Sequence, residues 1–261
     1  MAPESRKLDR DGVKIHYEVH GPREGAPTLL LSHGYSSTCR MWGGQVAALK
    51  DRYQVVIWDM RGHGESDYPK DPALYSEGLT VGDMRALLDV VGADKAIVGG
   101  LSLGGYMSLA FHASHSRRVR ALMLFDTGPG FKKDEARAKW NETANKRADD
   151  LDARGLAALN TSDEVKITKH RDAKGLASAA RGMLAQQTDR VIQSLDKINV
   201  PTLVLVGAND TNFLAATDYM AAKIKGATKV VIPDAGHASN LHQPALFNQA
   251  VETFLAKLPA A

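Results

Sequence analysis

Short apolar runs rich in β-branched residues recur along this chain of 261 residues, and stretches with helical spacing separate them. Runs of this kind are typical of strands that are buried on both faces of a sheet. We expect such strands at residues 28–32, 54–58, 95–99, 119–125, 202–206 and 229–232, and an outer strand of alternating polarity at 13–19. We expect helices at residues 45–49, 81–91, 102–115, 214–224 and 244–258. This alternation predicts an α/β protein with a parallel sheet and helices on both faces.

One interval of the chain interrupts this alternation. Residues 127–200 contain no convincing strand, and Ala, Lys, Arg, Glu and Asp dominate stretches such as 132–148. An interval of this length is far longer than an ordinary connection, and such insertions usually have a functional reason. We therefore expect a core formed by residues 1–126 and 201–261, and a helical cap insertion at 127–200 that includes the return helix into the core. A long surface excursion without that role is the alternative.

Composition and charge exclude several classes of function. Lys and Arg are interspersed with Asp and Glu, and the net charge is only +3, so no basic block indicates nucleic acid as a partner. No apolar stretch is long enough to span a membrane, and residues 1–17 lack the apolar region of a secretory signal. We therefore expect a cytoplasmic protein. Cys39 is the one cysteine, so no internal disulfide can form, and the oligomeric state stays open.

The motif Gly-Leu-Ser-Leu-Gly at residues 100–104 is the strongest sign of chemistry in the chain. It directly follows the expected strand at 95–99 and precedes a helix, which is the strand-turn-helix setting of a nucleophile elbow. In such a turn Ser102 adopts a strained backbone with positive φ, and Gly100 and Gly104 lack the Cβ atoms that would collide there. The N-terminus of the following helix favours negative charge near the hydroxyl. We therefore predict that Ser102 is the nucleophile.

A serine nucleophile needs a base and an acid that orients the base. Of the nine histidines, His237 follows the last expected strand and lies in a loop, so we predict that it is the base. Asp210 comes directly after the strand at 202–206, and the carboxyl ends of parallel strands are where open α/β sheets form their sites. The chain order Ser, Asp, His also matches this arrangement. Asp126, at the end of the strand at 119–125, is a competing candidate for the acid.

Two backbone N–H groups are candidates for an oxyanion hole. The first belongs to Leu103, the residue after the predicted nucleophile. The second belongs to Tyr35, because Gly34 permits a tight turn after the first buried strand that can point this N–H group into the site. A plain strand-ending turn at residues 33–34 is the alternative.

Together these motifs resemble the α/β-hydrolase superfamily, and within it the branch of esterases and 3-oxoadipate enol-lactonase-like enzymes. The matching segments run in the family's order and span nearly the whole chain, the expected cap excepted. They are His33-Gly34-Tyr35, Met41-Trp42, residues 59–66, residues 100–105, residues 207–210, and Gly236-His237. The resemblance implies the α/β-hydrolase fold, with a mostly parallel eight-stranded sheet and a helical cap, and it implies no cofactor and no metal.

The chain also departs from parts of that superfamily. Ser102 stands where haloalkane dehalogenases and epoxide hydrolases of this fold carry Asp, which argues against both activities. The loop around Gly34 lacks the additional glycines of the lipase-type HGGG motif, which argues against a relative of hormone-sensitive lipase. The cap has few large apolar residues, and the exceptions, Phe131 and Trp140, are expected to pack within it.

We therefore expect a serine hydrolase that cleaves a small-molecule carboxylic ester or lactone through an acyl-enzyme, with Ser102, Asp210 and His237 as the triad. The same residues can serve a carbon–carbon bond hydrolase, a perhydrolase or an amidase, and neither fold nor triad separates these reactions. Outside the enzymes, the alternative is a ligand-binding module that kept the scaffold, as some receptors of this fold do. The particular substrate depends on how the cap docks, which the sequence does not reveal.

Overall fold

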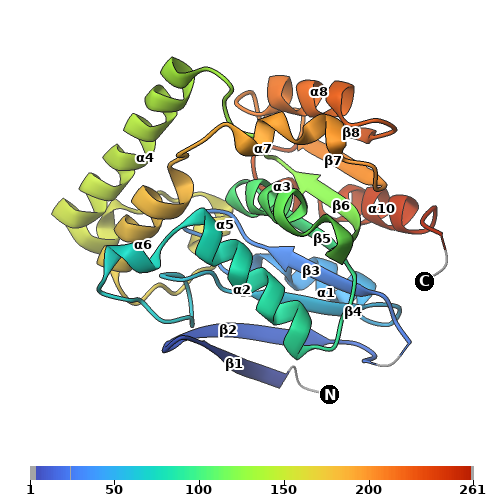
Figure 1. Cartoon of the computed structure of the whole chain (residues 1–261), viewed down its shortest axis with the longest axis horizontal. Helices are drawn as coiled ribbons and strands as arrows, with labels where there is room; N and C mark the ends of the chain where they lie inside the picture. The colour runs from blue at the N-terminus through green and yellow to red at the C-terminus, as the bar shows by residue number, and fades with distance from the viewer. Residues whose placement is uncertain (1–3, 24, 260–261) are drawn as a thin grey trace.

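An eight-stranded sheet in the order β1-β2-β4-β3-β5-β6-β7-β8 forms the centre of the computed structural model, which describes residues 4–23 and 25–259 (Figure 1). The pairs β1–β2 and β2–β4 are antiparallel, and every other pair is parallel. The mostly parallel eight-stranded sheet is therefore confirmed. The ends of the expected core at 1–3 and 260–261 lie outside the described residues. The strands are β1 (Glu4–Arg10), β2 (Val13–His20), β3 (Thr28–Ser32), β4 (Gln54–Trp58), β5 (Ala96–Leu101), β6 (Val119–Phe125), β7 (Thr202–Gly207) and β8 (Thr228–Ile232).

Helices cover both faces of this sheet because the central strands bury side chains in both directions. Along β3, Leu30 joins a hydrophobic cluster on one face, while Leu29 and Leu31 join a second cluster on the other. The first face is covered by α2 (Glu77–Val90), α3 (Leu103–His115) and α8 (Leu214–Lys223). The second is covered by α1 (Gly43–Leu49) and α10 (Pro244–Leu255). The expected helices on both faces are thus confirmed.

The first strand, β1, is the strand that the sequence pattern does not predict. The pattern places the outer strand at residues 13–19, but β1 pairs with β2 along its whole length and takes the edge position. The physical reason is polarity: the segment Glu-Ser-Arg-Lys-Leu-Asp-Arg holds a single apolar side chain, Leu8, which packs on the first cluster. An edge strand needs little apolar surface, because charged residues there also prevent pairing with other chains.

Residues 127–200, here called the insert, connect β6 to β7 and contain no strand. Its main helices α4 and α6 lie beyond the carboxyl ends of the parallel strands (Figure 1). Its helices are α4 (Asp134–Arg154), α5 (Asp163–Lys166), α6 (Ala173–Ala179), a π-helical turn η5 (Ala180–Leu184) and α7 (Arg190–Gln193). The remaining short elements of the chain are α9 (Ser239–His242), η1 (Cys39–Trp42), η2 (Pro72–Leu74), η3 (Ser116–Arg118), η4 (Gly155–Ala158) and η6 (Leu195–Lys197).

Glycine residues let the insert pack directly on the backbone of the core. A Cβ atom at Gly182 would lie under 3.0 Å from the carbonyl oxygen of Tyr75, and one at Gly62 would lie 2.6 Å from the carbonyl oxygen of Gly175. Gly62 also has a φ of +73°, which residues with a side chain rarely adopt. Apolar side chains of the insert, such as Leu176, belong to the same cluster as those of α2 and α3. The insert therefore docks without a layer of side chains between the two backbones at these points.

No helix within the described residues is both long and apolar enough to cross a bilayer.

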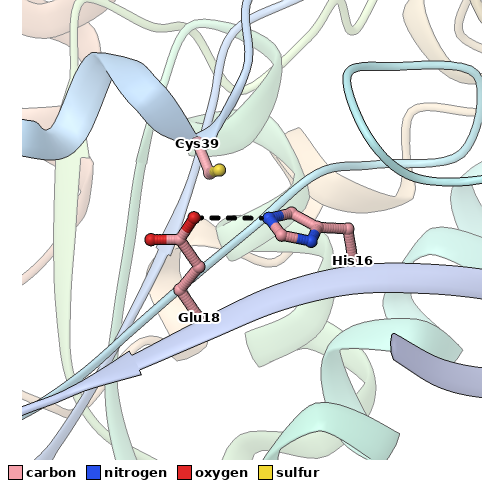
Figure 2. Close-up of side chains that lie close together, drawn as sticks. All are labelled: His16, Glu18 and Cys39. Atoms are coloured by element: carbon pink, nitrogen blue, oxygen red, sulfur yellow. Dashed lines mark ion pairs between the residues drawn. The ribbon is translucent and has the colours of Figure 1, made fainter. Parts of the chain in front are cut away.

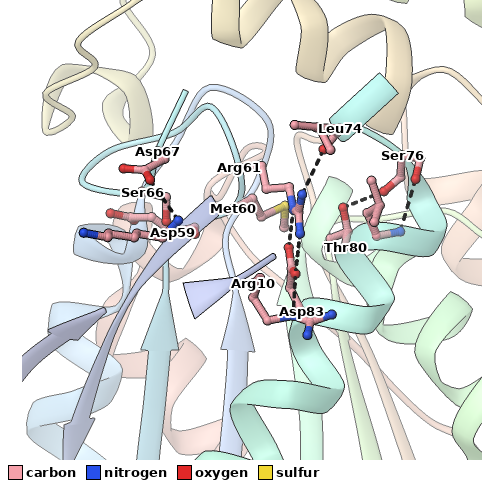
Figure 3. A network of polar contacts seen from close by, with 12 residues as sticks. Arg10, Asp59, Met60, Arg61, Ser66, Asp67, Leu74, Ser76, Thr80 and Asp83 are labelled. Atoms are coloured by element: carbon pink, nitrogen blue, oxygen red, sulfur yellow. Dashed lines mark hydrogen bonds and ion pairs between the residues drawn. The ribbon is translucent and has the colours of Figure 1, made fainter. Parts of the chain in front are cut away.

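Buried charges fix the loop that follows β4, as Figure 3 shows. Asp59 accepts hydrogen bonds from the backbone N–H groups of Cys39 and Glu65 at 2.7 and 2.9 Å. Two residues later, Arg61 forms a two-bonded ion pair with Asp83 of α2, at 2.7 and 2.9 Å. Arg10 of β1 donates to the same carboxylate at 3.1 Å. Asp83 thus joins the loop after β4, the edge strand and α2.

We expect Asp83→Asn to lower the free energy of unfolding by about 3–5 kcal/mol, because it leaves the buried Arg61 charge without its counter-charge. Urea unfolding measures this change. Asp89→Asn is the control on the same helix: its carboxylate is half exposed and pairs with Arg118, so a loss of at most about 1 kcal/mol is expected. Equal effects of the two substitutions would contradict a special role for the buried pair.

Candidate active site

Ser102 lies between the end of β5 and the start of α3, in a backbone conformation with φ of 55° and ψ of −117°. Its N–H group donates to the carbonyl oxygen of Phe125 at 2.9 Å, and its own carbonyl oxygen accepts from Thr127 Oγ1 at 2.6 Å. This backbone conformation costs about 1–3 kcal/mol for a residue other than glycine, and contacts with the surrounding structure must offset that cost. The expected strand-turn-helix geometry at Ser102 is present, and the side chain is half-buried.

The glycines on either side of Ser102 are required by close contacts between α3 and the sheet. A Cβ atom at Gly104 would lie under 3.0 Å from the carbonyl oxygen of Ser32 at the end of β3. A Cβ atom at Gly100 would collide with the backbone of Gly104. The first turn of α3 can therefore lie against the end of β3 only if both positions lack side chains.

His237 and Asp210, predicted from two separate loops, meet in the structure. His237 follows β8, Asp210 follows β7, and the histidine Nδ1 lies 2.8 Å from Asp210 Oδ2. This contact leaves Nε2 as the ring nitrogen that can exchange a proton. Burial alone lowers the pKa of His237, but the hydrogen bond and the charge of Asp210 outweigh it, so the pKa lies above the ordinary value of 6.5.

Phe213 stabilises the orientation of this imidazole. Its ring stacks on His237 with a centroid distance of 5.1 Å and an interplanar angle of 22°. Its backbone N–H donates to the carbonyl oxygen of Asp210, so the stacking residue and the carboxylate belong to one turn. The sequence pattern does not single out Phe213, because an aromatic residue after a strand is not by itself a signal of a site.

Asp126, the competing acid, is bound to other partners. Its carboxylate accepts hydrogen bonds from the backbone N–H of Gly207 at 2.8 Å and from the hydroxyl of Ser239. It is fully buried, and burial raises its pKa to about 7. Asp126 therefore connects the ends of β6 and β7 to the start of α9, while Asp210 is the carboxylate that bonds His237.

The loop after β3 lies against the candidate nucleophile. A Cβ atom at Gly34 would be 3.4 Å from the Cβ of Ser102, so this backbone passes directly beside the serine. The Tyr35 hydroxyl donates to the carbonyl oxygen of Leu176 in the insert at 3.0 Å. Leu103 is the first residue of α3, and the first N–H groups of a helix have no partner within it. Both backbone segments predicted for an oxyanion hole thus flank Ser102.

Neutral histidines hold the loop after β3 in place. His33 Nε2 accepts from the N–H of Met60 at 2.9 Å, and His63 Nε2 accepts from the N–H of Ser36 at 3.2 Å. His170 of the insert lies 3.0 Å from the carbonyl oxygen of Ser36 through its Nε2. Burial lowers the pKa of all three histidines, which keeps their acceptor nitrogens free of protons. These histidines position the loop.

One cluster away from Ser102 has the donor types of a metal site, as Figure 2 shows. His16, Glu18 and Cys39 are buried, and one ligand atom from each lies within 4.8 Å of the others. Glu18 Oε1 is 3.4 Å from His16 Nε2 and 3.0 Å from an Arg40 nitrogen, while its other oxygen faces His20 at 3.0 Å. Arg40 therefore already compensates the carboxylate's charge, and burial raises the pKa of the Cys39 thiol, which disfavours the thiolate that a metal would need.

Comparison with known proteins shows the family to which the chain belongs. Residues 29–250 match the alpha/beta hydrolase family, and the chain belongs to that family. It is 28% identical to 3-oxoadipate enol-lactonase 1 of Acinetobacter baylyi over 96% of both chains. The solved enol-lactonase of Burkholderia xenovorans LB400 is 28% identical, with a TM-score of 0.79 over 97% of this chain and all of the other.

A thermophilic esterase from Thermogutta terrifontis, solved with malate bound, is also 28% identical, with a TM-score of 0.81 over 98% of this chain and 99% of the other. The predicted resemblance to the α/β-hydrolase superfamily and its enol-lactonase-like and esterase-like members is therefore confirmed. The protein is a hydrolase of the α/β fold.

We expect Gly104→Ala to lower the free energy of unfolding by about 1–3 kcal/mol or more, because the added methyl group forces α3 away from the carbonyl of Ser32. Gly78→Ala is the matched control. Gly78 also lies in the first turn of a helix, nothing lies within 4 Å of the position that its Cβ atom would take, and alanine there is expected to be neutral or slightly stabilising. Thermal or urea unfolding of both variants provides the comparison, and a neutral Gly104→Ala would refute the close packing.

Proposed function

We propose that this protein is a serine hydrolase that cleaves a carboxylic ester or lactone through an acyl-enzyme intermediate. The observation that carries the proposal is the 2.8 Å contact between His237 and Asp210, at the same sheet edge as a serine held in the strained turn before α3. A nucleophile, a base and an acid that orients the base are the parts that acyl transfer requires. Similarity to an enol-lactonase and an esterase supports the same class of reaction.

In the proposed first step, Ser102 Oγ attacks the carbonyl carbon while its proton moves to His237 Nε2. Asp210 keeps the proton on Nδ1 in place and stabilises the imidazolium that forms. The new bond to Oγ converts the carbonyl into a tetrahedral oxyanion. When the carbon–oxygen bond to the alcohol breaks, His237 returns the proton to the leaving oxygen.

In the second step, water attacks the acyl-enzyme and gives its proton to His237. The tetrahedral intermediate then collapses, the bond to Oγ breaks, and Ser102 takes the proton back, which releases the acid. For a lactone, both products stay joined in one hydroxy acid.

The N–H groups of Leu103 and Tyr35 are proposed to hold the oxyanion in both steps. Leu103 supplies a free donor at the start of α3, where the helix dipole also favours negative charge. Tyr35 follows Gly34, which lies beside Ser102, and its side chain is held by Leu176 of the insert. Loss of one such donor typically slows acyl transfer by about 100- to 1000-fold.

We expect Ser102→Ala to abolish hydrolysis of short p-nitrophenyl esters and labelling by a fluorophosphonate, because no other group then forms the acyl bond. Ser114→Ala, on the same helix, is the control and should keep both. Undiminished labelling of Ser102→Ala would refute the assignment of the nucleophile.

The pH dependence of kcat/KM distinguishes the roles of Asp210 and Asp126, because it reports the pKa values of the free enzyme. Because Asp210 raises the pKa of His237, wild-type activity should rise through a pKa above 6.5 as the imidazole loses its proton. Asp210→Asn should lower turnover by up to about 10⁴-fold and shift this limb to lower pH.

Asp126→Asn is the matched comparison, since it removes a carboxylate that does not bond the histidine. It should cost less activity than Asp210→Asn and mainly reduce stability. A larger kinetic effect from Asp126→Asn would show that Asp126 is the orienting acid.

A further inference from the structure

The short helix α5 of the insert connects the two loops that flank the candidate nucleophile. On one side, the Ser37 hydroxyl donates to the carbonyl oxygen of Glu164 at 3.3 Å, and Ser37 is two residues beyond Tyr35. On the other side, His242 Nε2 lies 3.3 Å from the Asp163 carboxylate. The Nδ1 of the same histidine accepts from the N–H of Gly236, the residue before His237, at 2.9 Å. The helix α5 therefore lies across the site, from the predicted oxyanion loop to the predicted base.

The two carboxylates of α5 have different surroundings. Asp163 pairs with Lys166 at 2.9 Å and with His242, so its charge is compensated. Glu164 is half-buried, and within the described part of the chain its carboxylate forms no ion pair and no side-chain hydrogen bond. Glu164 also lies between the two loops of the site, because its carbonyl oxygen accepts from Ser37 and its neighbour Asp163 reaches His242. In agreement with this position, its charge contributes to raising the pKa of His237. Glu164 thus carries a carboxylate without a counter-charge on the turn that connects the loop after Tyr35 to the loop before His237.

We propose that Glu164 is a specificity-determining residue that repels substrates with a free carboxylate, so that this enzyme acts on neutral or cationic esters or lactones. The inference rests on the proposed ester or lactone hydrolysis and adds the charge class of its substrate. Discrimination against one class of substrate needs a group that repels it, and the unpaired carboxylate of Glu164 would repel a substrate carboxylate.

A residue that repels carboxylates would distinguish the substrate of this chain from the substrate that the name of 3-oxoadipate enol-lactonase 1 suggests. The enol-lactone of 3-oxoadipate is a dicarboxylic acid derivative that keeps one carboxylate after the lactone has formed. Such a substrate would bring its negative charge to a site that already holds the Asp210 carboxylate and lies beside Glu164. We therefore expect the enol-lactone of 3-oxoadipate to be a poor substrate of this protein, despite 28% identity to an enzyme of that name.

Three esters of similar size test the proposal: 4-nitrophenyl pentanoate, which is neutral, mono-4-nitrophenyl glutarate, which is anionic, and the 4-nitrophenyl ester of 4-(trimethylammonio)butanoate, which is cationic. The readout is the ratio of kcat/KM for the anionic ester to that for the neutral ester. This ratio cancels any change in the pKa of His237, since both esters use the same base. Because the bond to Ser37 uses the backbone carbonyl of Glu164, substitution of the side chain leaves that contact possible.

We expect Glu164→Gln to raise this ratio by about tenfold, and Glu164→Lys to raise it further, as Coulomb interactions at a partly shielded site imply. The cationic ester should show the opposite trend, and both trends should weaken at high salt. Glu142→Gln is the matched control: Glu142 is an exposed glutamate on α4, and its loss should leave the ratio unchanged.

An unchanged ratio in Glu164→Gln and Glu164→Lys would overturn the proposal, and so would wild-type preference for the anionic ester. Either result would still leave ester hydrolysis in place if the neutral ester is cleaved in a way that depends on Ser102. If the neutral ester is not cleaved at all, the proposed function itself is wrong.

Discussion

The close contact between the start of α3 and the end of β3 is the constraint on which the site depends. Ser102 has a positive φ because the chain must reverse from β5 into a helix that lies against the Ser32 carbonyl, and only glycine at positions 100 and 104 allows that approach. Two hydrogen bonds offset the cost of the strained serine: its N–H donates to the carbonyl oxygen of Phe125, and its carbonyl oxygen accepts from the Thr127 hydroxyl. The position of the hydroxyl is therefore set by packing of the whole sheet edge.

Two buried carboxylates at this sheet edge, Asp126 and Asp210, have different roles. Asp126 and Asp210 follow adjacent parallel strands, so both reach the same region, but their hydrogen-bond partners differ. Asp126 bonds a backbone N–H group and Ser239, and it stabilises the junction between β7 and α9. Asp210 bonds an imidazole and determines which ring nitrogen is available for proton transfer. Asp126 and Asp210 therefore differ in their hydrogen-bond partners, while both are buried and both follow a strand end.

Much of this arrangement could be predicted from the sequence, because buried parallel strands produce continuous apolar runs and the glycine-flanked serine requires its turn. The meeting of His237 with Asp210 also followed from their places after the last two strands. The edge strand β1 could not be predicted, since it buries only Leu8. The contacts of Asp163, Glu164 and His242 depend on how the insert docks, and no local pattern in a polar helix of one turn encodes that docking.

Backbone-to-backbone docking at Gly62 and Gly182 has a consequence for how small molecules reach Ser102. Close-packed contacts of this kind leave little room for displacement, so we expect the main part of the insert to move little relative to the core. The helix α5 is different: a hydrogen bond to Ser37, an ion pair with His242 and the buried Val165 hold it to its surroundings. Local opening costs least where few apolar contacts are lost. We therefore expect α5 to open locally at a lower free-energy cost than the rest of the insert, and this turn also carries the carboxylate proposed to discriminate among substrates.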